Sequence, residues 1–355
     1  MQKTQQYQTI LFPWLDEKTN ISSWNFEKDD TGIVMCLGSK HYQIATSTIL
    51  IIRNIHKSSI PIQLFHLGDE DLMREDQARL SQIPNVILSN LYDYVRPNSI
   101  QFESWDTKPF ALLFSKFRHV LLMDADGVLL QKPDHFFEHP FYTKTGALFF
   151  HDRSMTDEVK NWTQAQSIIR QLVPRNHTMH PDTRLFFNGS TNYLQESGVV
   201  LIDRKKHLIN LHAVCALNFG FVKEQIHSVT YGEKETYWIG FEMLEADYSF
   251  SNHFAGTIGK INDPAIDKVC SRHILHFDFD GEPLWFNGSL RDSNPVSYIF
   301  LVAQVWTEEI IHRGSWDWEG ALPCLSTSHP KELDPKYVQI IKEGIEILKS
   351  MNIIL

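Results

Sequence analysis

The sequence has few cysteines, no excess of positive charge and no long apolar run. Its four cysteines are scattered without a C-x-x-C pair, which argues against a structural zinc cluster. There are 33 basic against 43 acidic residues, a formal net charge of −10, so a nucleic-acid partner is disfavoured. No segment reaches the roughly 18 consecutive apolar residues that a membrane-spanning helix requires. The first residues, MQKTQQYQTILF, also lack the apolar core of a signal peptide.

The positions of the cysteines allow one cross-link. Cys36 and Cys215 lie in apolar runs, where a thiol packs as a small core residue. Cys270 and Cys324 could form a disulfide in an oxidising compartment, although spacing alone does not fix connectivity. Five asparagines occupy N-x-S/T triplets, which also arise by chance: Asn20, Asn161, Asn176, Asn188 and Asn287.

Two nucleotide-binding fingerprints are missing as well. There is neither a G-x-G-x-x-G nor a G-x-x-x-x-G-K-S/T, so the dinucleotide-binding and P-loop classes lack their signatures. Gly38 and Ser39 nevertheless follow a predicted strand and precede a predicted helix, where backbone amides commonly meet a nucleotide. An ordinary tight turn at Gly38 explains the same pattern, and both interpretations stay open.

The sequence contains enough apolar residues to form a large hydrophobic core. Apolar residues make up 43% and aromatic residues 12% of the 355 positions, which favours one large domain or two joined ones. From residue 31 onward, short apolar runs alternate with amphipathic segments, a pattern typical of βαβ units and a mostly parallel sheet. We expect strands at 32–37, 62–66, 86–88, 120–123, 146–151, 197–203 and 273–280, and helices at 43–57, 69–83, 107–117, 156–171, 208–219, 232–244 and 335–348. Residues 172–193 lack periodicity, and an irregular loop of this length is uncommon unless it has a function.

The segment His119–Lys132, HVLLMDADGVLLQK, places two carboxylates at the end of a buried strand. The unbroken apolar run before them is typical of a parallel strand covered on both faces. Ligands of open α/β sheets bind at the carboxyl ends of strands, where Asp124 and Asp126 fall. Because two neighbouring carboxylates repel each other, a cation is their natural partner.

This D-x-D motif admits two chemical interpretations. The letters D-x-D-G-V-L resemble the first motif of haloacid-dehalogenase-type phosphatases, but a convincing late acidic pair for magnesium is missing and three strands precede the motif. The other interpretation is a glycosyltransferase that uses a sugar nucleotide. There the cation would neutralise the charge that grows on the nucleoside diphosphate as it leaves.

A wider set of motifs favours the second interpretation. In order, the chain contains WDTKPFALLFSKFRHVLLMDADGVLLQKPDHFF, TKTGALFFHDR, QESGVVLIDRKKH, YGEKETYWIGFE and HFDFDGEPLWFNGS. These blocks, spread from Thr31 to Trp318, resemble the fungal α-mannosyltransferase family, α-1,3 type. The resemblance implies a GT-A fold of α/β class, a Rossmann-like and mostly parallel sheet flanked by helices with a smaller acceptor-binding part. It also implies retaining transfer of mannose from GDP-mannose with Mn²⁺ to a protein-linked or cell-wall glycan.

The same resemblance suggests a role for each polar block. The metal ligands would be Asp124, Asp126 and His276, a set of two carboxylates and one imidazole that suits manganese. One of three glutamates would assist at the anomeric carbon, and the alternatives Glu196, Glu233 and Glu235 stay open. The donor would contact Gly38, Ser39, Lys108, Asp124 and Ser197. The acceptor would contact Asp152, Arg153 and Trp285, although Asp152 and Arg153 could instead form a structural ion pair, and Trp316 and Trp318 are further candidates for stacking on sugar.

The resemblance also suggests an organisation and a location. Residues 1–30 would be a stem or lid, 31–130 the nucleotide-sugar half, and 131–355 the acceptor-binding and metal-completing half of one catalytic domain. Family members are Golgi type II membrane proteins, so we expect the Golgi lumen and an anchor outside this sequence. The alternatives are a glycogenin-like UDP-sugar transferase and a glycan-binding protein without activity.

Overall fold

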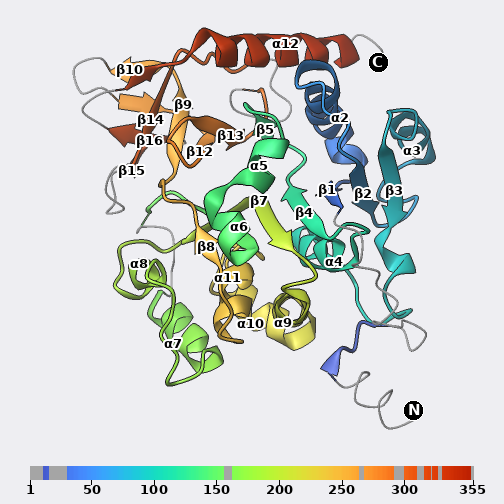
Figure 1. Ribbon diagram of the computed structural model, residues 1–355, viewed down its shortest axis with the longest axis vertical. Helices are drawn as coiled ribbons and strands as arrows, with labels where there is room; N and C mark the ends of the chain where they lie inside the picture. Colours follow the sequence, from blue (N-terminus) through green and yellow to red (C-terminus); the bar gives the residue numbers. More distant parts are fainter. Residues whose placement is uncertain are drawn as a thin grey trace.

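A central sheet of seven strands organises the computed structural model (Figure 1). The structure describes residues 11–15, 30–155, 162–263, 268–291, 300–309, 316–320, 322–326 and 330–352. The sheet order is β3 (Val86–Asn90), β2 (Ile62–His66), β1 (Thr31–Cys36), β4 (His119–Met123), β7 (Gln195–Asp203), β6 (Ala147–His151) and β8 (Ser249–Phe250). The first four strands are mutually parallel, whereas β7 runs antiparallel to both β4 and β6. The predicted α/β class and mostly parallel sheet are therefore confirmed.

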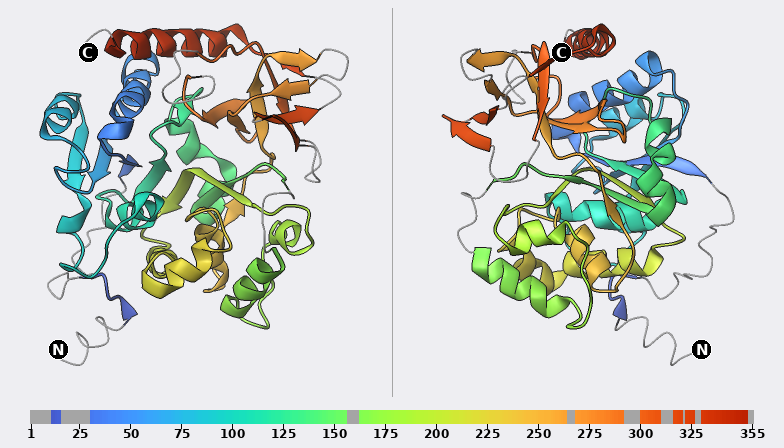
Figure 2. Two further views of the ribbon diagram at one scale, coloured as in Figure 1. Left: turned by 180° about the vertical axis from the view of Figure 1, so that it is seen from behind. Right: turned by 60° about the vertical axis from the view of Figure 1, so that its left-hand side comes forward.

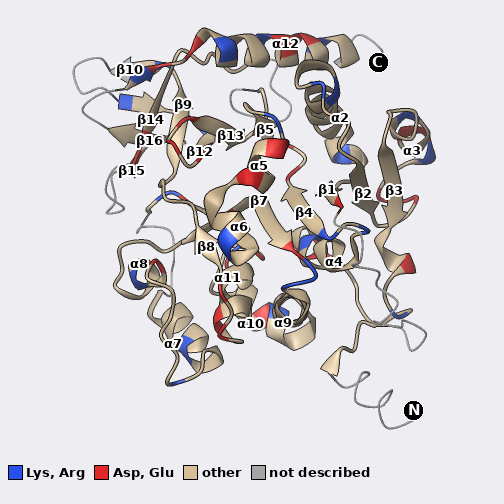
Figure 3. Ribbon diagram, in the orientation of Figure 1, with Lys and Arg blue, Asp and Glu red and all other residues tan. Residues whose placement is uncertain are grey.

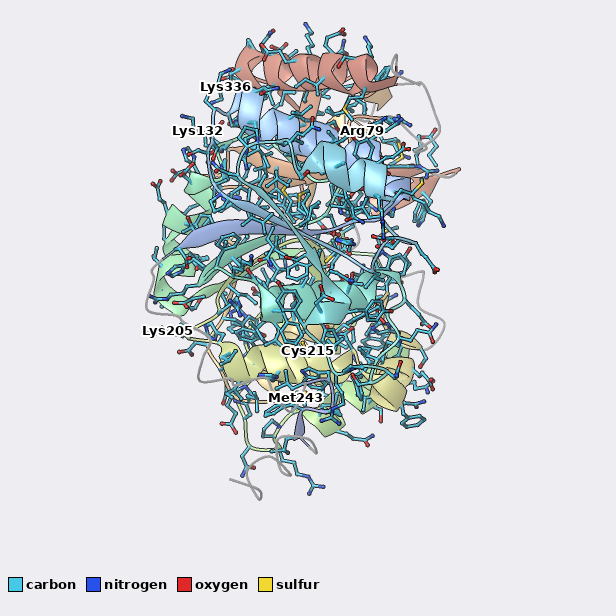
Figure 4. The ribbon with its side chains drawn as sticks, turned by 90° about the vertical axis from the view of Figure 1, so that its right-hand side faces the viewer. Arg79, Lys132, Lys205, Cys215, Met243 and Lys336 are labelled. Carbon is cyan, nitrogen blue, oxygen red and sulfur yellow. A yellow bond between two sulfur atoms is a disulfide. The ribbon has the colours of Figure 1, made fainter. Side chains whose placement is uncertain are left out.

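Helices cover both faces of this sheet because alternate strand residues are apolar on both sides. On β1, Ile33 and Met35 pack toward α2 (Tyr42–Leu50), and Val34 packs toward α4 (Thr107–Phe114). Figure 4 shows the strands between these two helical layers, with Cys215 in the layer of α4 and α9. The first face carries α2, its π-helical continuation η3 (Ile51–Ile55), α3 (Arg74–Leu80), α5 (Asp134–Glu138) and α6 (Pro140–Thr145); the second carries α4, α9 (Leu208–Leu217) and α11 (Thr236–Glu242).

Several helices differ from their predicted bounds. The helix expected at 69–83 is confined to α3, because the Asp71 carboxylate accepts a hydrogen bond from the Leu67 amide (2.9 Å) and holds the preceding residues in a turn. The segment 172–193 is not irregular throughout, since α8 (Thr183–Phe187) forms within it. α7 (Trp162–Leu172) and α10 (Gly220–His227) lie beside α8 and α9, and residues 156–161 of the helix predicted at 156–171 are outside the described residues.

Two antiparallel sheets form a second layer beside the first (Figure 2). The six-stranded sheet has the order β17 (Lys331–Glu332), β14 (Val305–Glu308), β9 (Gly256–Gly259), β12 (Ile274–Phe277), β13 (Pro283–Asn287) and β5 (Val128–Leu129). Because β5 directly follows the D-x-D turn, it ties this layer to the carboxyl end of β4. The four-stranded sheet has the order β10 (Ile261–Asp263), β11 (Lys268–Cys270), β16 (Leu322–Ser326) and β15 (Trp316–Glu319), and α12 (Pro335–Asn352) lies across α2 and the six-stranded sheet.

A disulfide joins Cys270 on β11 to Cys324 on β16, so the pairing that the sequence left open is present. Cys215 is buried in the core as expected, whereas Cys36 is only half-buried. No helix in the described part of the chain is long and apolar enough to cross a membrane. Acidic and basic residues occur together on the same elements, as on α3 and α12 (Figure 3).

The described part of the amino-terminal segment packs against the domain. Trp14 is buried with its ring 5.6 Å from that of Phe110, and Leu15 forms a β-bridge with Val95. Residues 11–15 are therefore fixed to the layer of α4 and α9. The stem or lid role of residues 1–30 stays a prediction, because most of that segment lies outside the described residues. The division at residue 130 stays a prediction too, since β6, β7 and β8 complete the sheet that the first half begins.

Candidate active site

A cavity of about 1430 Å³ opens where the carboxyl ends of β1, β2 and β4 meet the loops of the second half. Such convergence follows from the parallel strands, whose carboxyl ends share one edge of the sheet. The antiparallel β7 brings its amino-terminal end to the same edge. The predicted donor, metal, catalytic and acceptor residues that line this cavity are Gly38, Ser39, Lys108, Asp124, Asp126, Asp152, Arg153, Glu196, Ser197 and Glu233.

A buried lysine connects two carboxylates at the cavity floor. The Lys108 ammonium lies 2.6 Å from Asp124 Oδ1 and 2.9 Å from Glu233 Oε1. Burial alone would lower the pKa of Lys108, but the two carboxylates raise it above the usual lysine value, so the lysine is charged. Ser197 Oγ donates to Glu233 Oε1 (2.9 Å) and completes the group. Lys108 therefore holds Asp124 and Glu233 together across the gap between β4 and α11.

The D-x-D turn presents a second carboxylate, that of Asp126, which also lines the cavity. Burial and then the charge of Asp124 raise the pKa of Asp126 to about 6. The turn itself is fixed, because Thr48 Oγ1 donates to the carbonyls of Ala125 (3.0 Å) and Gly127 (3.2 Å). A positive charge near Asp124 and Asp126 would relieve their repulsion.

The chemistry of this pair fits a hard divalent cation, with the protein supplying two oxygen ligands. Among the residues that the structure describes, the only three possible metal ligands gathered within reach of one ion are Cys270, Glu319 and Cys324, and the two cysteines form the disulfide. A cation at Asp124 and Asp126 would therefore complete its shell with substrate and water oxygens. Oxygen ligands of this kind suit Mg²⁺ as well as Mn²⁺.

Glu196 lies at the start of β7 and is almost completely buried at the cavity wall. Its Oε1 accepts from the Gly198 amide (2.7 Å) and from Asn287 Nδ2 (3.0 Å). Within the described part of the chain, its Oε2 has no hydrogen-bond donor. Burial, followed by the charge of Asp152, raises the pKa of Glu196 to about 7. Glu196 thus presents one held and one unoccupied carboxylate oxygen.

The acceptor candidates Asp152 and Arg153 are anchored differently. Burial alone would raise the pKa of Asp152, but its ion pair with the Lys234 ammonium, together with Arg153, lowers it. Arg153 donates to the carbonyl of Arg272 (2.8 Å), and its guanidinium lies 5.4 Å from the centre of the Trp316 ring. Both residues line the cavity, but the contacts described above tie their side chains to other residues of the cavity wall.

The loop after β1 is a close-packed turn that faces the cavity. A Cβ added at Gly38 would lie 2.2 Å from Asp71 Oδ1, so only glycine fits there without displacing Asp71. Ser39 Oγ donates to Asp76 Oδ2 (2.7 Å), and the Ser39 amide donates to the Asp71 carbonyl (2.8 Å). The structure therefore shows the tight turn at Gly38, and a contact between this cavity-lining loop and a nucleotide stays a prediction.

Three predicted site residues lie elsewhere. His276 is buried on β12, stacked on the Trp285 ring at 4.2 Å and beside Phe150, and neither His276 nor Trp285 lines the cavity. The structure thus does not bring His276 to Asp124 and Asp126, nor Trp285 to an acceptor. The reason is their position along the β12–β13 hairpin: the pair Ile274 and Asn287, on the same face, reaches the cavity, whereas His276 and Trp285, two residues farther along, pack against Phe150 in the core.

Glu235 is the third residue that lies away from the cavity lining. Its Oε1 accepts from the amides of Leu194 (3.0 Å) and Gln195 (3.4 Å), and its Oε2 accepts from Trp238 Nε1. Glu235 therefore fixes the start of β7 to α11, and of the three glutamates only Glu196 and Glu233 face the cavity.

Sequence reasoning missed several cavity residues. Asn287, which bonds Glu196, was visible only as a glycosylation triplet. Lys234 stands between the two glutamates of G-E-K-E-T, and its bond to Asp152 joins positions 82 residues apart. No sequence signal marked Arg272, Arg291 or the aromatic lining residues Tyr193 and Tyr231.

Comparison with known proteins identifies the class of this chain. The family model described as "Mannosyltransferase putative" matches residues 30–278, and the chain belongs to this family. Membership favours sugar transfer over the phosphoester hydrolysis that D-x-D-G-V-L alone allowed. Together with the topology and the D-x-D at the end of β4, it confirms the predicted GT-A fold.

Particular relatives are α-1,3-mannosyltransferases by name. "Putative alpha-1,3-mannosyltransferase MNN14" of Candida albicans is 27% identical over 307 residues, covering 76% of this chain and 44% of the relative. Alpha-1,3-mannosyltransferase MNT2 of Saccharomyces cerevisiae is 26% identical over 321 residues, covering 79% of this chain and 56% of the relative. The chain thus spans about half the length of the curated relatives it matches.

Among solved structures, the chain resembles two glycosyltransferases at low similarity. The mannosyltransferase Ktr4p from S. cerevisiae has a TM-score of 0.41 and 12% identity, with 68% of this chain and 75% of that chain covered. The galactosyltransferase LgtC has a TM-score of 0.39 and 11% identity, with 62% and 73% covered.

Proposed function

We propose that the protein transfers mannose from GDP-mannose to a mannose-containing glycan, which is either protein-linked or part of a cell wall. The transfer would take place in this cavity, with retention of the anomeric configuration and with Mn²⁺ as the metal. The observation that carries this proposal is the convergence of Asp124, Asp126 and Lys108 on one cavity floor, at the edge of the sheet where nucleotides bind. The cavity volume of about 1430 Å³ exceeds the roughly 300–1,000 Å³ of sites for single small ligands, which leaves room for donor and acceptor together. The names of the relatives support an α-1,3 linkage.

Each residue then has a defined task. Asp124 and Asp126 would hold the cation, which supplies positive charge against the departing diphosphate. Lys108 keeps Asp124 in place, and the loop at Gly38 and Ser39 forms the wall for the nucleotide. The bond between the mannose anomeric carbon and the β-phosphate oxygen breaks, and GDP leaves with the electron pair. The acceptor hydroxyl oxygen bonds to that carbon, and its proton passes to the departing phosphate oxygen.

Glu196 is the best placed of the three glutamates to assist this transfer. Its unoccupied Oε2 belongs to a carboxylate at the cavity wall, and a negative charge there stabilises the positive charge that develops at the anomeric carbon. Glu233 faces the cavity but is already bonded to Lys108 and Ser197.

The disulfide supports the proposed location. Disulfides persist in oxidising compartments and are rare in the cytosol, so Cys270–Cys324 fits a lumenal compartment such as the Golgi.

Release of nucleoside diphosphate from a panel of sugar nucleotides tests the proposal. We expect GDP release from GDP-mannose, stimulated by an α-mannoside and abolished by a chelator, with Mn²⁺ and Mg²⁺ compared as the returned metal. Asp126→Asn should lower the rate about 10³-fold, because it removes a charge that holds the cation. The matched control is Asp247→Asn, at an exposed aspartate outside the cavity. Turnover of a UDP-sugar alone would overturn the donor and favour the glycogenin-like alternative.

A further inference from the structure

Three aromatic side chains form a row along one wall of the cavity. The ring of Trp105 lies 5.5 Å from that of Tyr231, which lies 6.2 Å from that of Tyr193. All three line the cavity, and Trp105 and Tyr231 are 48% and 57% exposed. We call these three residues the aromatic ledge. Large exposed rings gathered in a concave site are typical of a surface that binds a ligand.

The ledge is fixed in place before any ligand arrives. The Lys234 ammonium lies 3.8 Å from the centre of the Tyr193 ring and 5.2 Å from that of Tyr231. Gly232 adopts φ +63°, and a Cβ there would lie 3.0 Å from Trp105 Cε3, so glycine lets the indole rest against the backbone. A ligand would therefore not have to order these rings, which favours binding.

The position of the ledge separates it from the nucleotide side of the cavity. In the sheet order, β4 with its D-x-D lies between β1 and β2 on one side and β7 and β6 on the other. Two of its rings belong to the second side, because Tyr193 precedes β7 and Tyr231 lies close to Lys234, whose ammonium bonds Asp152 after β6. Trp105, in η5 (Ser104–Asp106) before α4, extends the row from the first half of the chain. Because Lys234 and Asp152 neutralise each other, the ledge suits a neutral ligand rather than a phosphate.

We propose that the aromatic ledge is the acceptor subsite and takes an α-linked mannose oligosaccharide of at least two sugar rings. The apolar faces of consecutive pyranose rings would stack on consecutive aromatic rings, while the acceptor hydroxyl points toward Glu196 and the donor. This inference rests on the proposed function for its chemistry. Trp318, 41% exposed on β15, also lines the cavity but is not part of the row.

The test compares acceptors of different length in the ledge variants Trp105→Ala and Tyr231→Ala. We expect the KM for α-mannotriose to rise roughly threefold to tenfold for each lost ring, since an aromatic contact contributes about 0.5–1.5 kcal/mol. The KM for methyl α-mannoside should rise less, and the KM for GDP-mannose should not rise. The variant Tyr231→Phe keeps the ring, so its KM for α-mannotriose should equal that of the wild type. Phe221→Ala removes a 71% exposed ring on α10 and serves as the control.

A direct binding measurement tests the aromatic ledge independently of the donor. Calorimetric titration with α-mannotriose requires no turnover, and the two alanine variants should weaken this binding by the same factors. If wild type releases no GDP but the variants still lose mannotriose binding, the ledge stands and the proposed transfer falls. An increased KM for GDP-mannose with unchanged acceptor KM would assign the ledge to the guanine base and overturn the proposal. Wild-type binding that is absent, or equal in the variants, would overturn it as well.

Discussion

Two glutamates 39 positions apart, Glu196 and Glu235, share burial and a raised pKa but differ in what their oxygens contact. Burial is the main cause in both, and each pKa is raised to about 7. Both oxygens of Glu235 accept hydrogen bonds from β7 and α11, whereas Glu196 Oε2 remains open at the cavity wall. A raised pKa therefore reports burial in both cases. An oxygen that accepts no hydrogen bond from the described residues is the feature that marks Glu196 as available for chemistry.

The same contrast separates the D-x-D from the histidine that was expected to join it. Asp124 and Asp126 follow β4 at the open edge of the sheet, while His276 lies within β12 and packs on Trp285. Aspartate and histidine both suit a metal site. The two aspartates reach the cavity because they follow the end of their strand, whereas His276 lies inside its strand and does not.

Among substitutions of Glu196, Glu235 and His276, Glu196→Gln should have the largest effect on transfer. The amide oxygen can still accept from Gly198 and Asn287, so the fold is kept, but the negative charge at the anomeric carbon is lost. We expect mannose transfer to fall about 10²–10³-fold, the range for removing one electrostatic stabiliser. Steady-state transfer and thermal unfolding measure the two properties separately, with Glu245→Gln at an exposed glutamate as control. Transfer at the wild-type rate would remove Glu196 from the mechanism.

Glu235→Ala should produce the opposite pattern. Three buried N–H donors, from Leu194, Gln195 and Trp238, lose their acceptor, which lowers the free energy of unfolding by about 3 kcal/mol. Urea denaturation measures this loss, and Glu245→Ala should show almost none. Transfer per folded molecule should stay close to wild type. A stable variant without transfer would instead give Glu235 a chemical role.

The smallest effect on activity should come from His276→Phe, which keeps an aromatic ring beside Trp285. Burial lowers the pKa of His276 to about 3, while an unfolded histidine titrates near 6.5. As pH falls below about 6.5, the unfolded state takes up a proton that the native state does not, so the stability contributed by the neutral histidine is lost. Between pH 7 and 5, wild type should therefore lose about 2 kcal/mol more of its unfolding free energy than the variant.

Transfer at pH 7 and denaturation at both pH values measure the outcome for His276→Phe. Full activity with a flatter stability profile is expected. Loss of metal-dependent transfer in a stable variant would return His276 to the metal site.

The sequence predicted those parts of the fold that local pattern controls. β1, β2 and β4 are apolar runs buried on both faces, and the D-x-D is a break in such a run, so both could be read from neighbouring residues. The antiparallel direction of β7 could not, because it depends on a long connection rather than on the composition of the strand. Nor could the partners Lys108–Glu233 and Asn287–Glu196, which join residues more than 90 positions apart, be derived from spacing. His276 and Trp285 lie away from the cavity because a motif gives residue types, whereas the position along the hairpin decides what surrounds each side chain.

Gly198 carries a consequence for comparing lineages of this family. A Cβ at this position would lie 2.8 Å from Asn287 Nδ2 and 2.9 Å from Glu196 Oε1, so a single methyl group displaces the carboxylate from its anchor while leaving the strand intact. The residue at this position therefore indicates whether the carboxylate equivalent to Glu196 can keep its anchored position. Where a homologous chain has glycine, the carboxylate can be held at the cavity wall; where it has a larger side chain, we expect the Glu196 carboxylate or the Asn287 amide to be displaced and transfer to be weaker.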